Sequence, residues 1–238
     1  AAQVPEDFIP RNTALHMDLQ LSGTLKELVL PFLEMAMTNR PDANLPDHDR
    51  EARRTRVMLD QITAGERFVI GINPPGKGTP MDGTIAFPVS EEQWKVLTEG
   101  TTKITYGDSE IYQDGTEFIS KIGGYAISGS SQAALEKALD LASGKSAESL
   151  NSNPDFRSAV SGQLPGHVLG ISLNIASLMS LMGTLPALPM QTYGDPGADL
   201  MKKILELFSY MGVSAGEAPS GYSFKINMIG NAEKLTAA

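Results

Sequence analysis

The chain of 238 residues contains no cysteine. Without a thiol it can form neither a disulfide nor a thiolate metal site, and it has no cysteine nucleophile. Histidine is scarce as well, and His16, His48 and His167 lie too far apart in the sequence to form a local metal-binding motif. The sequence therefore excludes thiol chemistry and predicts no metal ion and no cofactor.

Basic residues are fewer than acidic ones: the chain has 19 Lys and Arg residues and 28 Asp and Glu residues, and its net charge is −9 at pH 7. An acidic chain lacks the general attraction to phosphate that non-specific nucleic-acid binding requires. Long apolar runs are also missing, since the apolar stretch 28–37 is interrupted by Pro31 and Glu34. We expect no nucleic-acid partner and no transmembrane segment.

The chain begins AAQVPEDFIP. Small residues followed by a polar segment with proline are typical of what remains after cleavage at an A-x-A signal-peptidase site. A shortened sequence would begin in the same way. The start of the chain predicts an extracytoplasmic location, meaning the periplasm, the cell surface or the medium.

Apolar residues that alternate with polar ones predict strands at 15–21, 68–72, 85–89, 169–175 and 222–229. Apolar residues at helical spacing predict helices at 22–33, at 50–64, from 176 onwards and at 198–211. Gly65 and Gly212 are expected to end two of these helices. The order strand, helix, loop, helix, strand thus occurs twice, which indicates an internal duplication.

A different module lies between the two copies. Two long strands at 103–113 and 116–128 are joined at Asp114-Gly115, which is a hairpin-turn dipeptide. A helix capped by Ser130 or Ser131 follows, and a short helix starts at Asn153-Pro154.

These elements predict an α+β fold, with an antiparallel or mixed sheet and helices packed on one face. The two pseudo-repeated strand-helix-helix-strand halves would be residues 1–98 and 166–238. They would flank the hairpin and helix module at 99–165 within one compact unit.

Two fragments resemble catalytic motifs. Gly144-Lys145-Ser146 matches the end of a phosphate-binding loop, but Gly144 is expected to end a helix where that motif needs a helix to begin. Residues 212–216, G-V-S-A-G, match the nucleophile elbow of serine hydrolases, with Ser214 as the nucleophile. The predicted helix before and strand after Ser214 reverse the order of an elbow, and no histidine follows it. We expect no enzyme, and a hydrolase using Ser214 stays as an alternative.

Two charged clusters lie around residue 50. A group of acids could hold calcium but lacks the spacing of an EF-hand loop, so a solvated loop is favoured; these are Asp42, Asp47, Asp49 and Glu51. A group of arginines is expected to pair with nearby acids along a helix, or else to dock an anionic partner; these are Arg50, Arg53, Arg54 and Arg56.

Methionine is frequent, with 11 residues, and many lie on or beside the predicted helices of the two copies. Methionine fills irregular core gaps, and it also suits adaptable apolar surfaces. The loop 183–197 is rich in proline and carries apolar residues, which is typical of a loop that covers a groove or meets a partner. The candidate surface for an apolar ligand or partner therefore comprises Met179, Met182, Leu185, Leu188, Met190 and Tyr193.

Residues 123–175 resemble an exported bacterial protein family that is known only as a domain of unknown function. The matching features are a glycine-led strand, a helix and its glycine stop, a second helix start and an apolar strand: Gly124 to Ser128, Leu135, Ala138-Leu139, Gly144, Ser149-Leu150, Asn153, Phe156-Arg157, Leu164 to Gly166 and Leu169 to Ile175. The resemblance implies an extracytoplasmic domain built from repeated strand and helix units. It offers no catalytic residues.

The sequence therefore predicts a non-catalytic extracytoplasmic domain that acts by binding a protein partner or by self-assembly. A second hypothesis is a carrier that holds a lipid or another apolar small molecule between sheet and helices. That carrier needs a cavity of roughly 300 Å³ or more.

Overall fold

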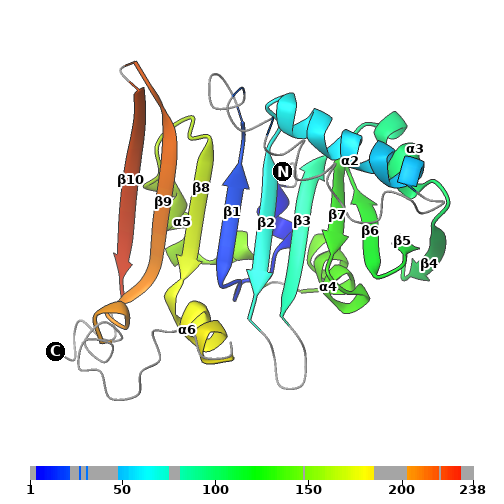
Figure 1. Ribbon diagram of the computed structural model, residues 1–238. Helices are drawn as coiled ribbons and strands as arrows, with labels where there is room; N and C mark the ends of the chain where they lie inside the picture. The colour runs from blue at the N-terminus through cyan, green and yellow to red at the C-terminus, as the bar shows by residue number, and fades with distance from the viewer. Residues whose placement is uncertain are drawn as a thin grey trace.

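Ten antiparallel strands form one sheet that runs across the molecule (Figure 1). The computed structural model describes residues 4–21, 27, 31, 48–74, 81–146, 148–184, 203–219 and 221–231. The strands are β1 (Leu15–Leu19), β2 (Phe68–Asn73), β3 (Asp82–Pro88), β4 (Thr102–Tyr106), β5 (Ser109–Asp114), β6 (Glu117–Ile122), β7 (Tyr125–Gly129), β8 (Leu169–Asn174), β9 (Phe208–Ala218) and β10 (Gly221–Gly230). The α+β prediction is confirmed, and strands from all three predicted segments join the same sheet.

The sheet order is β10-β9-β8-β1-β2-β3-β7-β6-β5-β4. The first three strands, β1, β2 and β3, form a meander, and the last three, β8, β9 and β10, form another. The two meanders meet at their first strands, because β1 pairs antiparallel with β8. The hairpin module extends the sheet on the far side of β3.

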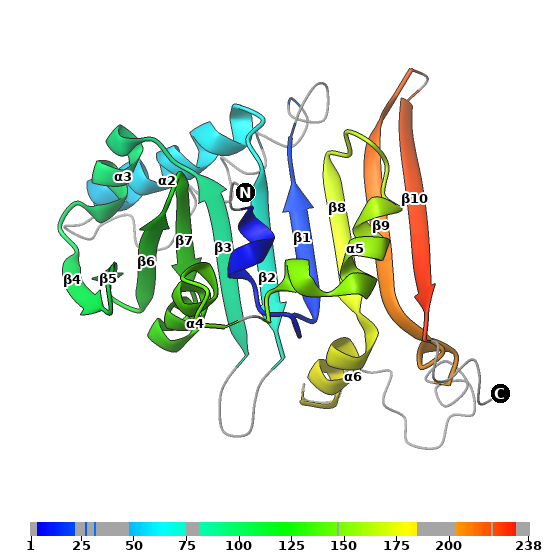
Figure 2. The ribbon, with the colours of Figure 1, turned by 180° about the vertical axis from the view of Figure 1, so that it is seen from behind.

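The helices cover both faces of the sheet. They are η1 (Pro5–Phe8), α2 (His48–Thr63), α3 (Glu91–Thr98), α4 (Gln132–Ala142), η2 (Leu150–Ser152), α5 (Pro154–Ser161) and α6 (Ile175–Thr184). In Figure 1, α2 crosses the front of the sheet, whereas Figure 2 shows η1, α4 and α5 on the back.

The prediction that helices pack on one face is therefore wrong. Neighbouring residues explain the difference: Phe87 is buried in the cluster under α2, whereas Ala86 is buried in the cluster under α4. Ala126 and Ile127 divide between the two clusters in the same way. Strands that are apolar on both sides need cover on both sides.

The hairpin module contains four strands where the sequence predicted two. The turn between β5 and β6 follows Asp114 as predicted. Two further turns lie inside the predicted strands, at Gly107 and at Gly123, with φ of +57° and +56°. Glycine adopts this left-handed conformation without strain, so each long strand folds into a hairpin of its own.

The helix caps of the middle segment are as predicted. The Ser131 hydroxyl accepts a hydrogen bond from the backbone N–H of Ala134 at the start of α4. Gly144, with φ of +72°, follows the C-terminal end of α4. The side chain of Asn153 accepts hydrogen bonds from the first turn of α5. The Gly-Lys-Ser fragment thus lies at the end of a helix, where the helix dipole does not favour phosphate.

The predicted helix 198–211 is wrong over its last four residues, because β9 begins at Phe208. Pairing with β8 on one side and β10 on the other overrides the local helical pattern here. Residues 198–202 lie outside the described residues, as do most of the predicted helix 22–33 and residues 38–47. Within the described part of the chain, no helix is long and apolar enough to span a membrane.

Candidate functional site

The front of the sheet carries an unbroken array of apolar side chains across five strands, which we call the apolar face. Cross-strand pairing aligns them in rows. One row runs Ile70, Met17, Ile171, Val213 and Ile226, and the rows beside it are Ile72, Leu15, Leu173, Met211 and Met228, and Phe68, Leu19, Leu169, Ala215 and Phe224. Alternation along each strand explains the array, because every second residue points to the same side.

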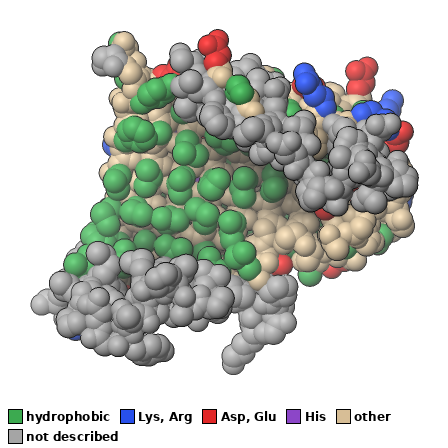
Figure 3. Space-filling view, in the orientation of Figure 1, with side chains coloured by type: hydrophobic (Ala, Val, Ile, Leu, Met, Phe, Trp, Pro, Cys, Tyr) green, Lys and Arg blue, Asp and Glu red, His purple; other side chains and the backbone are tan. Residues whose placement is uncertain are grey.

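Much of the apolar face is open to solvent. Residues of this face on β1, β8 and β9 are all partly exposed, and exposure is highest on the edge strand β10. Phe224 is 76% exposed and Ile226 is 65% exposed. Figure 3 shows the expanse of apolar side chains over this half of the sheet. A patch of this extent is unusual on a folded monomeric chain and is typical of surfaces that contact another molecule.

The opposite side of the same strands is buried and carries small or polar residues. Gly170 and Ser172 on β8 alternate with the apolar residues, as do Gly212, Ser214 and Gly216 on β9. Their small side chains let α5 and the segment after it approach the sheet closely. This half of the sheet thus buries its polar side and exposes its apolar side.

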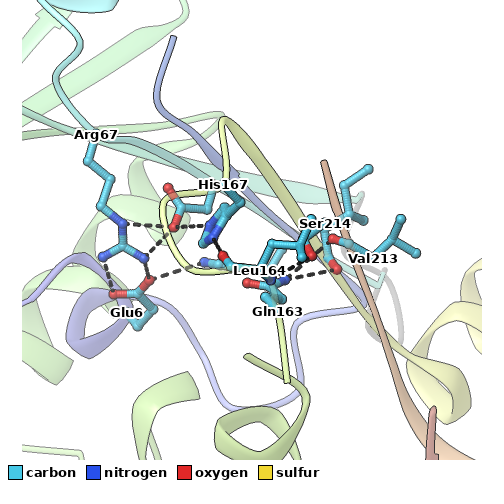
Figure 4. A network of polar contacts seen from close by, with 10 residues as sticks. Glu6, Arg67, Gln163, Leu164, His167, Val213 and Ser214 are labelled. Carbon is cyan, nitrogen blue, oxygen red and sulfur yellow. Dashed lines mark hydrogen bonds and ion pairs between the residues drawn. The ribbon is translucent and has the colours of Figure 1, made fainter. Parts of the chain in front are cut away.

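A chain of ion pairs lies on the buried side (Figure 4). The guanidinium of Arg67 forms an ion pair with Glu6, and it donates hydrogen bonds of 2.8 and 2.7 Å to the carboxylate of Asp18. The ring of His167 joins them, with Nε2 at 3.4 Å from the same Asp18 oxygen and Nδ1 at 3.0 Å from the Leu164 carbonyl oxygen. We call Glu6, Asp18, Arg67 and His167 the polar network.

Charge and burial set the protonation of the polar network. Burial would raise the pKa of the Asp18 carboxyl, but hydrogen bonds from His167 and Arg67 outweigh burial and hold this pKa below its ordinary value. Burial would likewise raise the pKa of Glu6, and His16 and Arg67 lower it instead. The hydrogen bond to Asp18 raises the pKa of His167. The network therefore favours two carboxylates facing a guanidinium and a protonated imidazole.

The polar network connects segments that lie far apart in the sequence. Its four side chains join η1, β1, the residue before β2 and the loop before β8. Each charge faces an opposite charge, which is the arrangement that makes a buried charge tolerable. The lowered pKa of Asp18 and the raised pKa of His167 both favour the charged, paired forms of these two groups.

Ser214 lies within β9 and is 1% exposed. Its hydroxyl accepts a hydrogen bond of 2.9 Å from the backbone N–H of Leu164. The surrounding backbone is a continuous strand, whereas the nucleophile elbow needs a sharp turn between a strand and a helix. The predicted helix before Ser214 is also absent over residues 208–211, which are strand.

The predicted apolar surface around residues 179–193 is described only in part. Met179 is half-buried in α6, and Met182 lies on the same helix. Leu185, Leu188, Met190 and Tyr193 lie outside the described residues. The prediction for this surface therefore stays a prediction.

Three of the four arginines predicted to pair with acids do so, and the side chain of the fourth, Arg50, lies outside the described part of the chain. Arg53 donates to Glu99 at 2.8 Å, and Arg56 donates to Asp60, one turn further along the helix, at 2.9 Å. Arg54 forms an ion pair with Asp114. Of the acidic cluster, Asp42 and Asp47 lie outside the described residues.

The sequence did not reveal the apolar face or the polar network. Alternation predicts a strand at 222–229, but spacing alone does not show that its residues Phe224, Ile226 and Met228 are exposed. The signal for the network is the alternation of His16 and Asp18 with leucine and methionine in β1, which predicts a two-sided strand without showing which side is buried.

No protein-family model matches the chain, and no curated protein matches it. Among solved structures, the chain is similar to crystal form IV of TP0453, with a TM-score of 0.51 and 8% identity over 96% of this chain and 81% of that chain. Crystal form III of TP0453 gives a TM-score of 0.49 and 9% identity over 97% of this chain and 82% of that chain. The likeness to crystal form IV, at so low an identity, shows a shared fold and nothing beyond it.

Proposed function

We propose that the chain is a non-catalytic binding protein that holds an apolar partner against its apolar face. The observation that carries this proposal is the inverted burial of the β1, β8, β9 and β10 half, with Asp18 and Ser214 inside and Phe224 and Ile226 in contact with solvent. Leaving large apolar side chains in water forgoes about 25 cal/mol for each Å² of apolar area. A partner that covers them recovers that free energy.

A protein partner, in an extracytoplasmic setting, is the form of this function that we favour. The apolar face spans several strands and is broad, which suits a partner surface or an amphipathic helix better than a small molecule. The proposed internal duplication is supported by the two three-stranded meanders that meet at β1 and β8.

The experiment that tests this function is native mass spectrometry of the chain purified from its own host without detergent. We expect a bound species on the wild-type chain that is lost in Phe224→Asn, because Phe224 is largely exposed and its replacement leaves the fold intact. Thr105→Asn, an exposed position on β4, is the control and should keep the bound species. A bare chain, or the same species on both variants, would count against the proposal.

A lipid carrier is the second form, and the same spectrum separates it by the mass of the bound species. The apolar face would suit acyl chains. The cavities of the described residues favour it less: the space between α2 and the sheet, beside Met58 and Phe87, measures about 190 Å³. A hollow of about 480 Å³ near Arg11 and Lys137 is lined largely by polar residues. The first is smaller than the roughly 300 Å³ that a ligand pocket needs, and the second does not suit an apolar ligand.

A further inference from the structure

The strand β10 is a long edge with little to protect it. It forms one side of the ten-stranded sheet and pairs, within the described residues, only with β9. It runs for ten residues, from Gly221 to Gly230, and contains no proline and a single charged residue, Lys225. No described element lies beside its outer edge in Figure 1 or Figure 2. Long apolar edges of this kind are templates for another strand.

The opposite edge of the sheet, β4, has features that prevent pairing with a strand of another molecule. β4 has five residues, of which Thr102, Lys103 and Thr105 are exposed and polar. Lys103 forms an ion pair with Glu110 on the neighbouring strand β5. Short length and charge are the devices that keep an edge from pairing. The two edges of one sheet therefore differ, and β10 is the one left able to pair.

We propose that β10 pairs with β10 of a second copy of this chain, antiparallel and centred on Ile226. In this register Ile226 faces Ile226 of the second copy, and Phe224 faces Met228. Lys225 faces Asn227, so no like charges are opposed. Shifting the centre to Lys225 would place two lysines opposite each other, which destabilises a strand pair. The register centred on Ile226 keeps nine residues of each strand paired, from Tyr222 to Gly230.

The second copy is the occupant that fits this edge. Antiparallel self-pairing about Ile226 creates a closed two-fold dimer, so one surface patch serves both partners. It also brings the four exposed apolar side chains of β10 against those of the second copy: Tyr222, Phe224, Ile226 and Met228. The area removed from solvent is on the order of 1,000 Å², which is just below the range for stable specific interfaces and is typical of weak, reversible ones. The dimer should accordingly be in equilibrium with the monomer at roughly micromolar concentrations.

The proposal concerns the edge of β10, and it can fail while the proposed function of the apolar face stands. Sedimentation velocity of the purified full chain over a range of concentrations is the measurement, because it needs no other partner. We expect a dimer in the wild-type chain. Ile226→Lys and Ile226→Glu should each weaken dimerisation roughly tenfold or more, because each places like charges across the two-fold axis.

The decisive sample is an equal mixture of Ile226→Lys and Ile226→Glu. Since residue 226 faces its own copy, the mixture should dimerise again, whereas Thr105→Lys and Thr105→Glu on β4 should behave as wild type. A wild-type chain that stays monomeric would overturn the proposal. So would a dimer that both Ile226 variants leave unchanged, or a mixture that stays monomeric.

Discussion

Gly212 in β9 lies directly beneath Ala159 in α5, so that a β-carbon on Gly212 would come within 2.8 Å of the Ala159 carbonyl oxygen. That oxygen belongs to a helix backbone and cannot rotate away as a side chain could. Gly212, Ser214 and Gly216 form the small-residue side of β9, which faces the buried side of the sheet. Close packing against α5 therefore explains the glycine at position 212, and the loop 164–167 lies against Ser214 and Gly216.

The substitution Gly212→Ala should lower the free energy of unfolding by about 1–3 kcal/mol, because the added methyl group overpacks the contact with α5. Gly124→Ala is the matched control, since a β-carbon there meets nothing within 4 Å and φ is not positive. The control should change stability by less than about 1 kcal/mol. Urea unfolding measures both variants, and equal effects would contradict the packing argument.

The substitution Ser214→Ala should lower the free energy of unfolding by about 1–3 kcal/mol, because the backbone N–H of Leu164 loses its acceptor. Ser172 lies on the same side of the neighbouring strand β8 and is equally buried, but its hydroxyl has no hydrogen-bond partner among the described residues. Ser172→Ala should therefore cost much less. Ester turnover that disappears in Ser214→Ala would instead favour the hydrolase alternative.

The substitution Asp18→Asn should destabilise the fold, because it leaves Arg67 and His167 without their shared carboxylate. Breaking a fully buried ion pair costs about 3–5 kcal/mol, and the partial exposure of Arg67 reduces our expectation to about 2 kcal/mol. A double-mutant cycle with Arg67→Gln checks the contact itself. We expect the double variant to lose less than the sum of the single losses, and simple additivity would show that the pair does not interact.

The free energy of unfolding should fall both when the pH rises above neutral and when it falls into the acidic range. The pKa of His167 is raised above 6.5, so its stabilisation is complete below that pH and is lost as pH rises through the folded-state value. The pKa values of Asp18 and Glu6 are lowered from 3.8 and 4.5, so their stabilisation is present above those values and is lost as pH falls through the folded-state values.

The variant His167→Gln separates the two effects. Urea unfolding at a series of pH values should show the loss of stability above pH 6.5 in the wild-type chain only. The acid-side loss should remain in both proteins, because Asp18 and Glu6 still face Arg67. An alkaline-side loss that is the same in both proteins would mean that His167 does not carry it.

The sequence predicted the parts of the fold that depend on local chemistry. The cap at Ser131, the helix start at Asn153 and the turn after Asp114 all follow from side chains that bond to nearby backbone or favour a turn. Local chemistry does not predict the structure of segments whose secondary structure is set by pairing with other strands. Phe208 to Met211 fit a helical pattern, yet they lie in a strand that pairs on both sides.

The candidate site was missed for a related reason. The alternation in β1 correctly predicted a strand with two different sides, but not which side is buried. Asp18 points inward because Arg67, from another part of the chain, supplies the opposite charge, and His16 beside it lies 3.4 Å from the carboxylate of Glu6. Such partners are set by the tertiary fold, and the spacing of residues in one strand carries no information about them.

Site-specific photo-crosslinking tests most directly the claim that the apolar face is a binding surface. The photoreactive aromatic p-benzoylphenylalanine would replace Phe224 on β10, or Thr105 on β4 as the control, in the chain produced by its own host. We predict a discrete crosslinked product from position 224 and none from position 105, with the mass of the adduct distinguishing another protein or a lipid from a second copy of this chain, which the β10 dimer alone would give. No product from position 224, or the same products from both positions, would contradict the account.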